Sequence, residues 1–255
     1  MKKMFFSVIA SILMIYFLVG LLLYLFQNSL IYYPTPLVKH AFTEKIFMND
    51  DETIRVITLN EGKKNAIVYF GGNAESVAHS AEVFFDKFPE YTVYLVNYRG
   101  YGGSSGTPTQ AGLFNDAIYI YDNIKKDHQH IIAIGRSLGS AVAVYLASQR
   151  EIEKLVLITP FDTLQSVAQE QYPIFPMSFF LKDKYRSVEY VEKNSAKKTL
   201  MLIAQDDKII PASHAYTLAK YFVQNDLTIK VIEGKGHNTI SSDKSYYTLL
   251  KEFID

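Results

Sequence analysis

Apolar positions follow two patterns along this chain of 255 residues. One unbroken run occupies the N-terminus, and from about Glu44 short strand-like runs alternate with amphipathic helical stretches. Residues 74–88 carry apolar side chains at helical spacing, whereas residues 65–70 form a short apolar run typical of a buried strand. Such alternation predicts an α/β fold, in which helices cover both faces of a mostly parallel sheet.

The predicted elements fill one globular domain, for which we expect residues 44–255. The full chain has 49% apolar and 20% charged residues, a composition typical of a folded globular protein. We expect strands at 53–59, 65–70, 92–98, 130–134, 154–158, 199–204 and 227–232, and helices at 74–88, 110–126, 140–147, 212–223 and 243–253.

One long insertion interrupts the alternation. Residues 163–196 lie between two predicted strands and are too many for a simple crossover loop. We interpret the insertion as a small cap over the strand ends; the alternative is a second packing helix that does not contact the site. The insertion is rich in apolar and aromatic residues, among them Tyr172, Ile174, Phe175, Met177, Phe179, Phe180 and Leu181.

The N-terminal run, Met4 to Phe26, has 23 residues and is broken only by two serines and one glycine. As a helix it is about 34 Å long, enough to cross the hydrocarbon core of a bilayer. All its faces are apolar, which disfavours a helix buried against one side of a globular core. We therefore expect residues 1–28 to form a transmembrane anchor and residues 29–43, with Pro34 and Pro36, to form a non-helical connector.

The charges beside the anchor predict its orientation. Lys2 and Lys3 precede it, and no charge follows until Lys39. Because positive charge stays on the cytoplasmic side, we expect a single-pass protein with a cytoplasmic N-terminus and the remaining chain outside the cytoplasm. The alternative is a cleaved signal peptide, which needs a shorter apolar core and a small-x-small cleavage site; none is evident after Gly20.

Composition narrows the chemistry. Lysine plus arginine equals aspartate plus glutamate, at 26 each, so no charge excess indicates nucleic acid or an acidic partner. The chain has no cysteine, which excludes disulfides, thiolate metal sites and a cysteine nucleophile. We expect neither a metal nor an organic cofactor.

The pentapeptide Gly-Arg-Ser-Leu-Gly at residues 135–139 carries the strongest chemical signal. It follows an apolar strand-like run and opens a helical stretch, so that Ser137 lies at the apex of a strand–turn–helix. Small residues two positions on either side permit the sharp turn that holds a serine hydroxyl clear of a sheet. The pattern predicts Ser137 as a nucleophile, with the Leu138 amide as one donor to an oxyanion.

A serine nucleophile needs a base, and position distinguishes one of the six histidines. His237 follows the last predicted strand, at the sheet edge where Ser137 is expected. His214 falls inside a predicted helix, where we expect a surface residue. His237 is therefore the predicted base.

The acid that orients the base should follow an earlier strand. Asp206 and Asp207 both come directly after the strand predicted at 199–204. Asp162, after the strand at 154–158, is a third option, although it also suits the N-cap of a helix in the insertion.

The second oxyanion donor should come from the turn after the strand at 65–70. That turn is Gly71-Gly72-Asn73, and the helix expected after it adds positive potential. We expect the Asn73 amide to be the donor; the alternative is a glycine turn needed only for chain reversal. For the substrate itself we expect contacts from Gly72, Phe161, Tyr172 and Phe175.

Together these stretches resemble the α/β-hydrolase superfamily, and within it the membrane-anchored serine hydrolases of the Bem46 type. The resemblance spans about residues 65–240 and implies the α/β-hydrolase fold and a Ser137–Asp207–His237 triad, with Asp207 favoured over Asp206. The matching stretches are Gly71-Gly72-Asn73-Ala74-Glu75, Asn97-Tyr98-Arg99-Gly100-Tyr101-Gly102-Gly103-Ser104, residues 135–139, Thr159-Pro160-Phe161-Asp162, Asp206-Asp207-Lys208-Ile209-Ile210-Pro211 and Gly236-His237-Asn238.

Three positions depart from that family's pattern. Gly71 stands where the family usually has histidine, Asn97 where it has aspartate, and Ala204-Gln205 where it has His-Gly. None removes a triad member, but the first changes what can hold the oxyanion loop.

The resulting hypothesis is a membrane-anchored serine hydrolase that acts on a small-molecule or lipid-like acyl substrate. The aromatic insertion favours an apolar acyl group, so esters and thioesters come first. A peptidase or amidase of the same fold, acyl transfer to another acceptor, and a non-catalytic binding module at the membrane are the alternatives.

Overall fold

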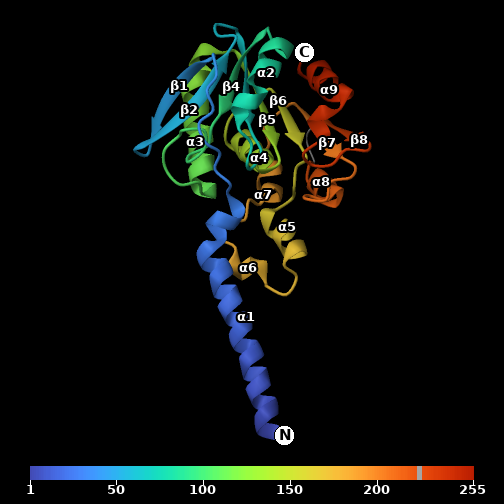
Figure 1. The fold of residues 1–255 in the computed structure, drawn as a ribbon. Helices are drawn as coiled ribbons and strands as arrows, with labels where there is room; N and C mark the ends of the chain where they lie inside the picture. The colour runs from blue at the N-terminus through green and yellow to red at the C-terminus, as the bar shows by residue number, and fades with distance from the viewer. Residues whose placement is uncertain (223–225) are drawn as a thin grey trace.

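An eight-stranded sheet forms the centre of the molecule, and one long helix projects from it (Figure 1). The computed structural model describes residues 1–222 and 226–255, so Val223, the expected end of one helix, lies outside the described residues. The strand order is β1-β2-β4-β3-β5-β6-β7-β8; the β1–β2 and β2–β4 pairs are antiparallel, and the remaining pairs are parallel. The predicted α/β class is confirmed.

The strands agree closely with the apolar runs of the sequence, with one exception. Strand β1 at the sheet edge is not predicted, because its outward-facing side chains, such as Ile46 and Met48, are exposed and its pattern is correspondingly weak. The strands are β1 (Thr43–Asn49), β2 (Glu52–Leu59), β3 (Asn65–Phe70), β4 (Tyr91–Val96), β5 (His130–Arg136), β6 (Lys154–Ile158), β7 (Lys198–Ala204) and β8 (Asp226–Ile232).

Helices cover both faces of the sheet and enclose two apolar cores. Helices α3, α4 and α7 pack on one face, and α2 and α9 pack on the other. The helices are α1 (Lys2–Ile31), α2 (Ala81–Lys87), α3 (Gln110–Ile124), α4 (Leu138–Gln149), α5 (Leu164–Gln171), α6 (Met177–Phe180), α7 (Ser187–Val191), α8 (Ala212–Ala219) and α9 (Lys244–Ile254), with 3₁₀ turns at Val77–Ser80, Lys125–Asp127 and Ile240–Ser242.

One predicted helix begins later than expected. The pattern predicts helix from residue 74, but the chain makes a turn there, with Ala74 at a φ of 60°. The 3₁₀ turn follows at Val77, and α2 begins only at Ala81. The residues before it are held in a loop beside Ser137 instead.

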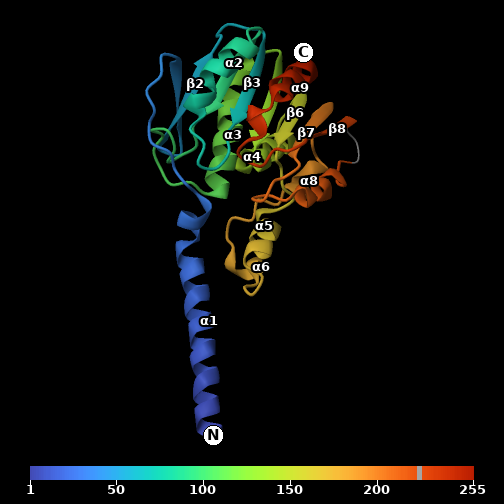
Figure 2. The same cartoon turned by 45° about the vertical axis from the view of Figure 1, so that its right-hand side comes forward.

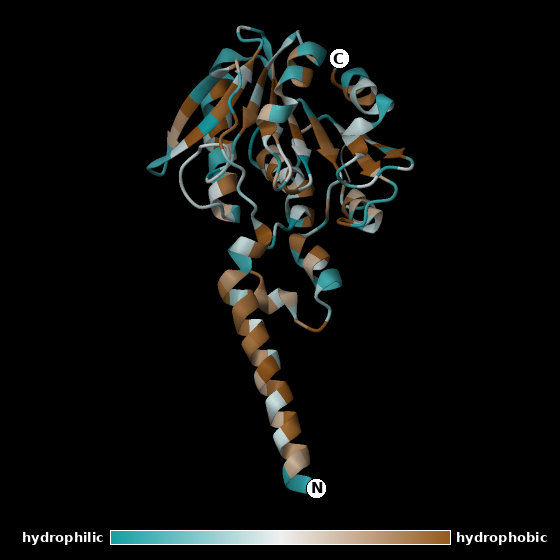
Figure 3. Cartoon of the chain, in the orientation of Figure 1, coloured by the Kyte–Doolittle hydropathy of each residue, from teal (hydrophilic) through white to brown (hydrophobic). Residues whose placement is uncertain are grey.

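Helix α1 extends away from the domain, and its N-terminus is far from the sheet in both views (Figures 1 and 2). It has 30 residues and, within the described part of the chain, is the one helix long and apolar enough to cross a membrane. Its surface is apolar along most of its length (Figure 3), and only Gly20 and Gln27 are buried.

The insertion after β6 divides into two parts. Helices α5 and α6 project from the sheet on the same side as α1 (Figures 1 and 2). Helix α7 instead packs against α4, and Val191 belongs to the apolar core there.

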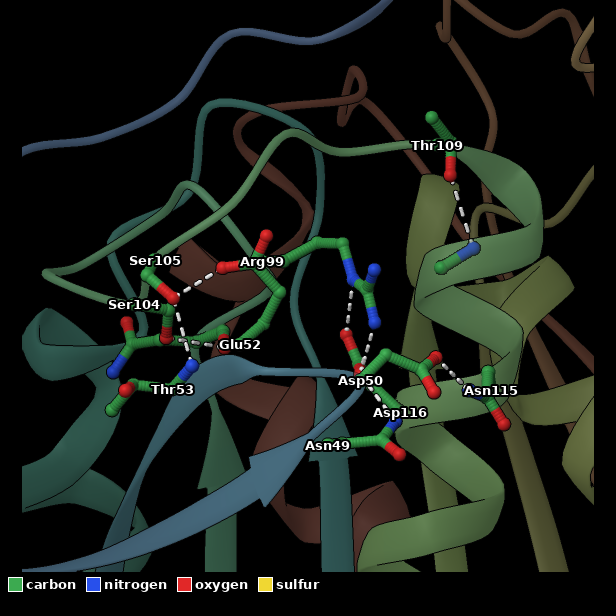
Figure 4. Close-up of polar contacts among 12 residues, drawn as sticks. Asn49, Asp50, Glu52, Thr53, Arg99, Ser104, Ser105, Thr109, Asn115 and Asp116 are labelled. Carbon is green, nitrogen blue, oxygen red and sulfur yellow. Dashed lines mark hydrogen bonds and ion pairs between the residues drawn. The ribbon is translucent and has the colours of Figure 1, made fainter.

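The segment after β4 is held by a buried ion pair (Figure 4). Arg99 donates two hydrogen bonds to the Asp116 carboxylate on α3, at 2.8 and 2.6 Å, and Asn49 at the end of β1 donates a third at 2.8 Å. The side chain of Asp116 is only 2% exposed. Because an unpartnered buried charge is costly, this pair fixes the loop relative to α3 and β1.

We expect Asp116→Ala to lower the free energy of unfolding by about 3 kcal/mol, because it leaves the Arg99 guanidinium without its carboxylate. Urea unfolding followed by circular dichroism in detergent measures the loss. Asp122→Ala, on the same helix as Asp116, is the matched control. The ion pair that Asp122 forms with Arg150, which follows α4, is much more exposed. This control should cost less than about 1 kcal/mol; equal losses in both variants would refute the role of the buried pair.

Candidate functional site

Ser137 lies between β5 and α4 in a backbone conformation that L-residues rarely adopt, with φ 51° and ψ −117°. The surrounding backbone leaves no room for side chains at the flanking glycines. A Cβ on Gly135 would lie 2.2 Å from the Gly139 carbonyl oxygen, and one on Gly139 would lie 2.1 Å from that of Phe70. The two glycines therefore allow the elbow to be pressed against β3, which positions the Ser137 side chain at the carboxyl edge of the sheet.

The structure brings Ser137, His237 and Asp207 together from three loops. The His237 Nε2 atom is 2.9 Å from Ser137 Oγ, and its Nδ1 atom is 2.7 Å from Asp207 Oδ2. All three residues are buried. Since a carboxylate oxygen accepts, Nδ1 carries the proton that it donates to Asp207, and Nε2 accepts from the serine hydroxyl.

Backbone amides hold the Asp207 carboxylate in place. Its Oδ1 atom accepts hydrogen bonds from the amides of Ile209 and Ile210, at 2.9 and 2.8 Å, which leaves Oδ2 for His237. Asp206 is exposed. The structure therefore brings Asp207 rather than Asp206 to His237.

Asp162, the third option for the acid, pairs with a different histidine. His214 Nδ1 lies 2.6 Å from Asp162 Oδ1, which also accepts from the Ser166 hydroxyl at 2.7 Å. The expectation of a surface position for His214 is wrong: it is 4% exposed. The N-cap of α5 is Thr163, whose hydroxyl accepts from the Ser166 amide, so the capping interpretation of Asp162 is also wrong.

The pairing shifts both groups toward their charged forms. Burial disfavours the Asp162 carboxylate, but hydrogen bonds from His214 and Ser166 outweigh it and lower the pKa of Asp162. Burial likewise disfavours the imidazolium, but Asp162 raises the pKa of His214 above its ordinary value. This ion pair joins the start of α5 to α8.

The loop at Gly71-Gly72-Asn73 passes beside Ser137. A Cβ on Gly72 would lie 3.6 Å from Ser137 Cβ, so the loop and the elbow are in close contact. Within the described part of the chain, the Asn73 amide has no acceptor. Leu138 is the first residue of α4, so its amide has no acceptor within that helix. The two amides that the sequence predicts as oxyanion donors are thus unpaired, one in the loop after β3 and one at the start of α4 beside it.

Two tyrosines from the segment after β4 hold this loop. The Tyr98 hydroxyl donates to the Gly71 carbonyl at 2.7 Å, and the Tyr101 hydroxyl donates to Asn73 Oδ1 at 2.7 Å. Asn73 Oδ1 also accepts from the Tyr33 amide at 3.0 Å, which ties the loop to the connector after α1.

A partly buried ion pair that sequence reasoning missed supports the same loop from behind. Glu75 Oε2 accepts from the Gly72 amide at 2.7 Å and lies 3.3 Å from Arg136 Nη1, while Arg136 Nη2 donates to the His237 carbonyl at 3.3 Å. Burial disfavours the charged form of Arg136, but the neighbouring Glu75 carboxylate helps to raise the pKa of Arg136 above its ordinary value. Both residues lie inside the motifs quoted above, but no local pattern shows that they meet.

A cavity of about 460 Å³ lies over Ser137 and His237. Among the predicted substrate contacts, Phe161 and Tyr172 line it, whereas Gly72 and Phe175 are not part of its wall. Phe175 is buried and instead stacks on Tyr16 of α1, with ring centroids 4.9 Å apart.

Helix α1 forms part of the cavity wall, which the sequence does not predict. Leu23, Gln27, Leu30 and Ile31 all line the cavity. The available signal was Gln27, the polar residue that directly follows the apolar run of residues 4–26. Among the described residues, no group of three or more histidine, aspartate or glutamate side chains is arranged to hold a metal ion.

Comparison with known proteins gives consistent matches. A family model described as the alpha/beta hydrolase fold matches residues 65–189. An uncharacterized protein of Mycobacterium tuberculosis is 34% identical over 182 residues, which cover 69% of this chain and 64% of that protein, just under two thirds of its length. The protein bem46 of Schizosaccharomyces pombe is 26% identical over 260 residues, covering 91% of this chain and 87% of bem46.

Solved structures match the same architecture. An esterase of Pyrococcus furiosus superposes with a TM-score of 0.66 and 17% identity, covering 88% of this chain and 96% of the esterase. At this identity the likeness shows the fold.

We expect His214→Gln to lower the melting temperature most at mildly acidic pH. Because the folded-state pKa of His214 is raised, its ion pair stabilises the fold fully below the ordinary histidine pKa of about 6.5 and loses that effect as pH rises through the folded value. The lowered pKa of Asp162 preserves the pair until the pH falls below the ordinary range of aspartate.

Melting temperatures of both proteins between pH 5 and 9 provide the measurement, with about one point per pH unit. The gap between wild type and variant should narrow as pH rises. His79→Gln, at an exposed position, serves as the control and should change the melting temperature little. A gap that widens with rising pH would contradict the charged pair.

Proposed function

We propose that this chain, which has the alpha/beta hydrolase fold, is a membrane-anchored serine hydrolase cleaving carboxylic esters or thioesters through an acyl-enzyme. One observation carries the proposal: Ser137 Oγ is 2.9 Å from His237 Nε2, and His237 Nδ1 is 2.7 Å from the amide-held carboxylate of Asp207. A nucleophile, a base and a group that orients the base are the requirements of this chemistry.

In the first half-reaction Ser137 Oγ bonds to the carbonyl carbon of the substrate while His237 Nε2 takes the hydroxyl proton. The carbonyl oxygen becomes an oxyanion, for which the amides of Asn73 and Leu138 are the donors. The bond to the leaving group then breaks, and His237 returns the proton to the departing alcohol or thiol. The product is an ester between the acyl group and Ser137.

In the second half-reaction water attacks the acyl-enzyme, and His237 takes the water proton. The bond to Ser137 Oγ breaks, the serine regains its proton from His237, and a carboxylic acid leaves. Asp207 keeps the imidazole in the required tautomer through both halves.

The cavity supports an ester or thioester with an apolar acyl group as the substrate. Its wall within the described residues contains no aspartate, glutamate, lysine or arginine, so it offers no ionic partner to a charged substrate. The structurally similar Pyrococcus furiosus protein is an esterase, which agrees with this reaction class.

We expect a fluorophosphonate probe to label the wild-type protein and not Ser137→Ala, because the probe bonds to an activated serine oxygen. Gel fluorescence of the purified full-length proteins measures the labelling. Turnover of a short p-nitrophenyl ester distinguishes an enzyme from a binding module of the same fold. Equal labelling of Ser137→Ala would assign the nucleophile elsewhere, and labelling of neither protein would remove the proposed function.

A second expectation concerns the acid. Asp207→Asn should reduce kcat by about 10³- to 10⁴-fold, because the amide no longer selects the histidine tautomer that accepts the serine proton. His237→Ala should lose about 10³-fold or more in kcat. Steady-state hydrolysis of a p-nitrophenyl ester measures both effects.

Asp206→Asn is the matched control for the acid, because it makes the same chemical change at the neighbouring exposed position. It should leave kcat within about twofold of wild type. A large loss in Asp206→Asn with little in Asp207→Asn would reverse the assignment.

A further inference from the structure

We propose that residues 172–181, here called the cap tip, lie within the bilayer beside α1, and that the substrate is a bilayer lipid ester whose acyl chain enters the cavity sideways between the two. The inference names the substrate class for the proposed hydrolase and so rests on that function. It assigns the anchor helix a second role, as one wall of the substrate site.

The cap tip packs against the middle of the apolar run of α1. The Tyr16 hydroxyl donates to the Ile174 carbonyl at 3.0 Å, and its ring stacks on Phe175. One turn further along, Phe180 lies so close to Gly20 that a Cβ there would be 2.9 Å from its ring. A segment in contact with Tyr16 and Gly20 is held at the depth of those residues when α1 spans a bilayer.

The position of the interface follows from the charged and aromatic groups along α1. Between Lys3 and Tyr24 the helix rises about 32 Å, close to the roughly 30 Å thickness of a hydrocarbon core. Tyr24 lies beneath Lys182, whose Nζ atom is 4.4 Å from the ring centroid, a pairing suited to the headgroup level. Tyr16 is eight residues before Tyr24, so its partners lie about 12 Å inside the hydrocarbon boundary.

The side chains of the cap tip suit that environment. No charged residue occurs between Gln171 and Leu181. Phe179 is 83% exposed and Ile174 is 70% exposed, so these two large apolar side chains of the tip point away from the protein. Apolar groups of this size, next to a helix that spans the membrane, are stabilised by contact with lipid chains.

The backbone carbonyls of the tip, from Tyr172 to Pro176, are satisfied as contact with lipid requires. Each of the five carbonyl oxygens from Tyr172 to Pro176 has a donor: Gln169 Nε2 lies within 3.0–3.3 Å of three, Tyr16 donates to that of Ile174, and the Phe179 amide donates to the last. Two of the five residues are prolines, which have no N–H. Non-helical backbone is tolerated at membrane depth only when its polar groups are satisfied in this way.

Polar contacts also join α1 to the end of the tip and to the residues that follow it. Gln27 Nε2 donates to the Phe180 carbonyl at 3.1 Å, and Gln27 Oε1 accepts from the Lys182 amide at 2.7 Å. Beyond the helix, Tyr32 donates to Asp183 at 2.6 Å. These contacts fix the domain relative to α1 and therefore fix the mouth of the cavity relative to the bilayer.

The cavity connects this level with the nucleophile. Its wall includes Ser137 and His237 at the sheet and Leu23, one residue before the interfacial Tyr24, on α1. Most of the lining side chains between them are apolar and come from both sides, with Leu30 and Ile31 from α1 and Met177, Phe180 and Leu181 from the cap tip. An acyl chain in the adjoining leaflet therefore has an apolar route to Ser137 that does not pass through water.

The test of the cap tip uses the absence of tryptophan from the chain. Full-length Phe179→Trp, reconstituted in phosphatidylcholine vesicles, should show blue-shifted emission that is quenched when the acyl chains are brominated. Phe85→Trp is the matched control: it is exposed on α2, at the opposite end of the domain from α6 (Figures 1 and 2), and should be neither shifted nor quenched. Equal quenching of the two, or none of Phe179→Trp, overturns the membrane position.

The test of the substrate class compares two substrates. Phe179→Asp should lower hydrolysis of a long-chain fluorogenic ester embedded in vesicles by about tenfold or more, because a carboxylate disfavours insertion of the tip. Its turnover of p-nitrophenyl acetate should stay within about twofold of wild type, and Phe85→Asp should retain both activities.

The outcomes separate this inference from the function on which it rests. If wild type hydrolyses p-nitrophenyl acetate but not the vesicle ester, the lipid substrate is wrong and the hydrolase stands. If wild type hydrolyses neither, the proposed function fails. If Phe179→Asp loses both activities, the quenching of Phe179→Trp still decides where the tip lies, and an unquenched tip refutes the sideways route.

Discussion

The close approach of the Ser137 elbow to the end of β3 is the constraint on which the site depends. With any side chain at Gly139, the backbone of α4 could not lie against the Phe70 carbonyl. This contact places the turn that carries Ser137 next to the loop that carries Asn73. The strands from β3 to β8 run parallel, so the loops after β7 and β8 lie at the same edge. These loops place Asp207 and His237 beside Ser137.

Around this edge, buried charges position loops more than they add stability. Glu75 and Arg136 lie behind the oxyanion loop and connect it with the backbone of His237. Asp162 and His214 connect the start of α5 to α8 in the same manner. A buried ion pair gains little net free energy over an apolar replacement, but breaking it is costly, so each pair selects one arrangement of its loops. Preorganised donors and a fixed base are what acyl transfer requires of such loops.

The anchor helix and the insertion form one structural unit. Tyr16, Gly20 and Gln27 recur at helical spacing along one face of α1, and each contacts the chain between residues 174 and 182. A flexible tether would leave the domain free to tumble above a membrane. The observed packing instead gives the cavity one orientation relative to α1, and in our proposal this couples substrate access to the way the helix lies in a bilayer.

Local patterns were sufficient for the features that are encoded locally. Periodicity predicted the α/β class and most element bounds, and the glycines around Ser137 predicted the elbow. The position of His237 after the last strand was enough to select it as the histidine beside Ser137. The apolar length of residues 4–26 indicated the anchor for the same reason: each of these signals is complete within a short stretch of chain. The weak pattern of β1 shows the limit, because an edge strand with exposed side chains leaves little apolar periodicity to detect.

Tertiary contacts alone decided the rest. Asp206 and Asp207 follow the same strand, and only the family resemblance favoured Asp207. The amides of Ile209 and Ile210 and the direction of the turn bring Asp207 to His237. The helical pattern predicts a surface position for His214, but Asp162, far away in sequence, lies beside it. That α1 lines the cavity depends on packing between segments more than a hundred residues apart. Such contacts depend on which side chains meet in space, and no local pattern records that.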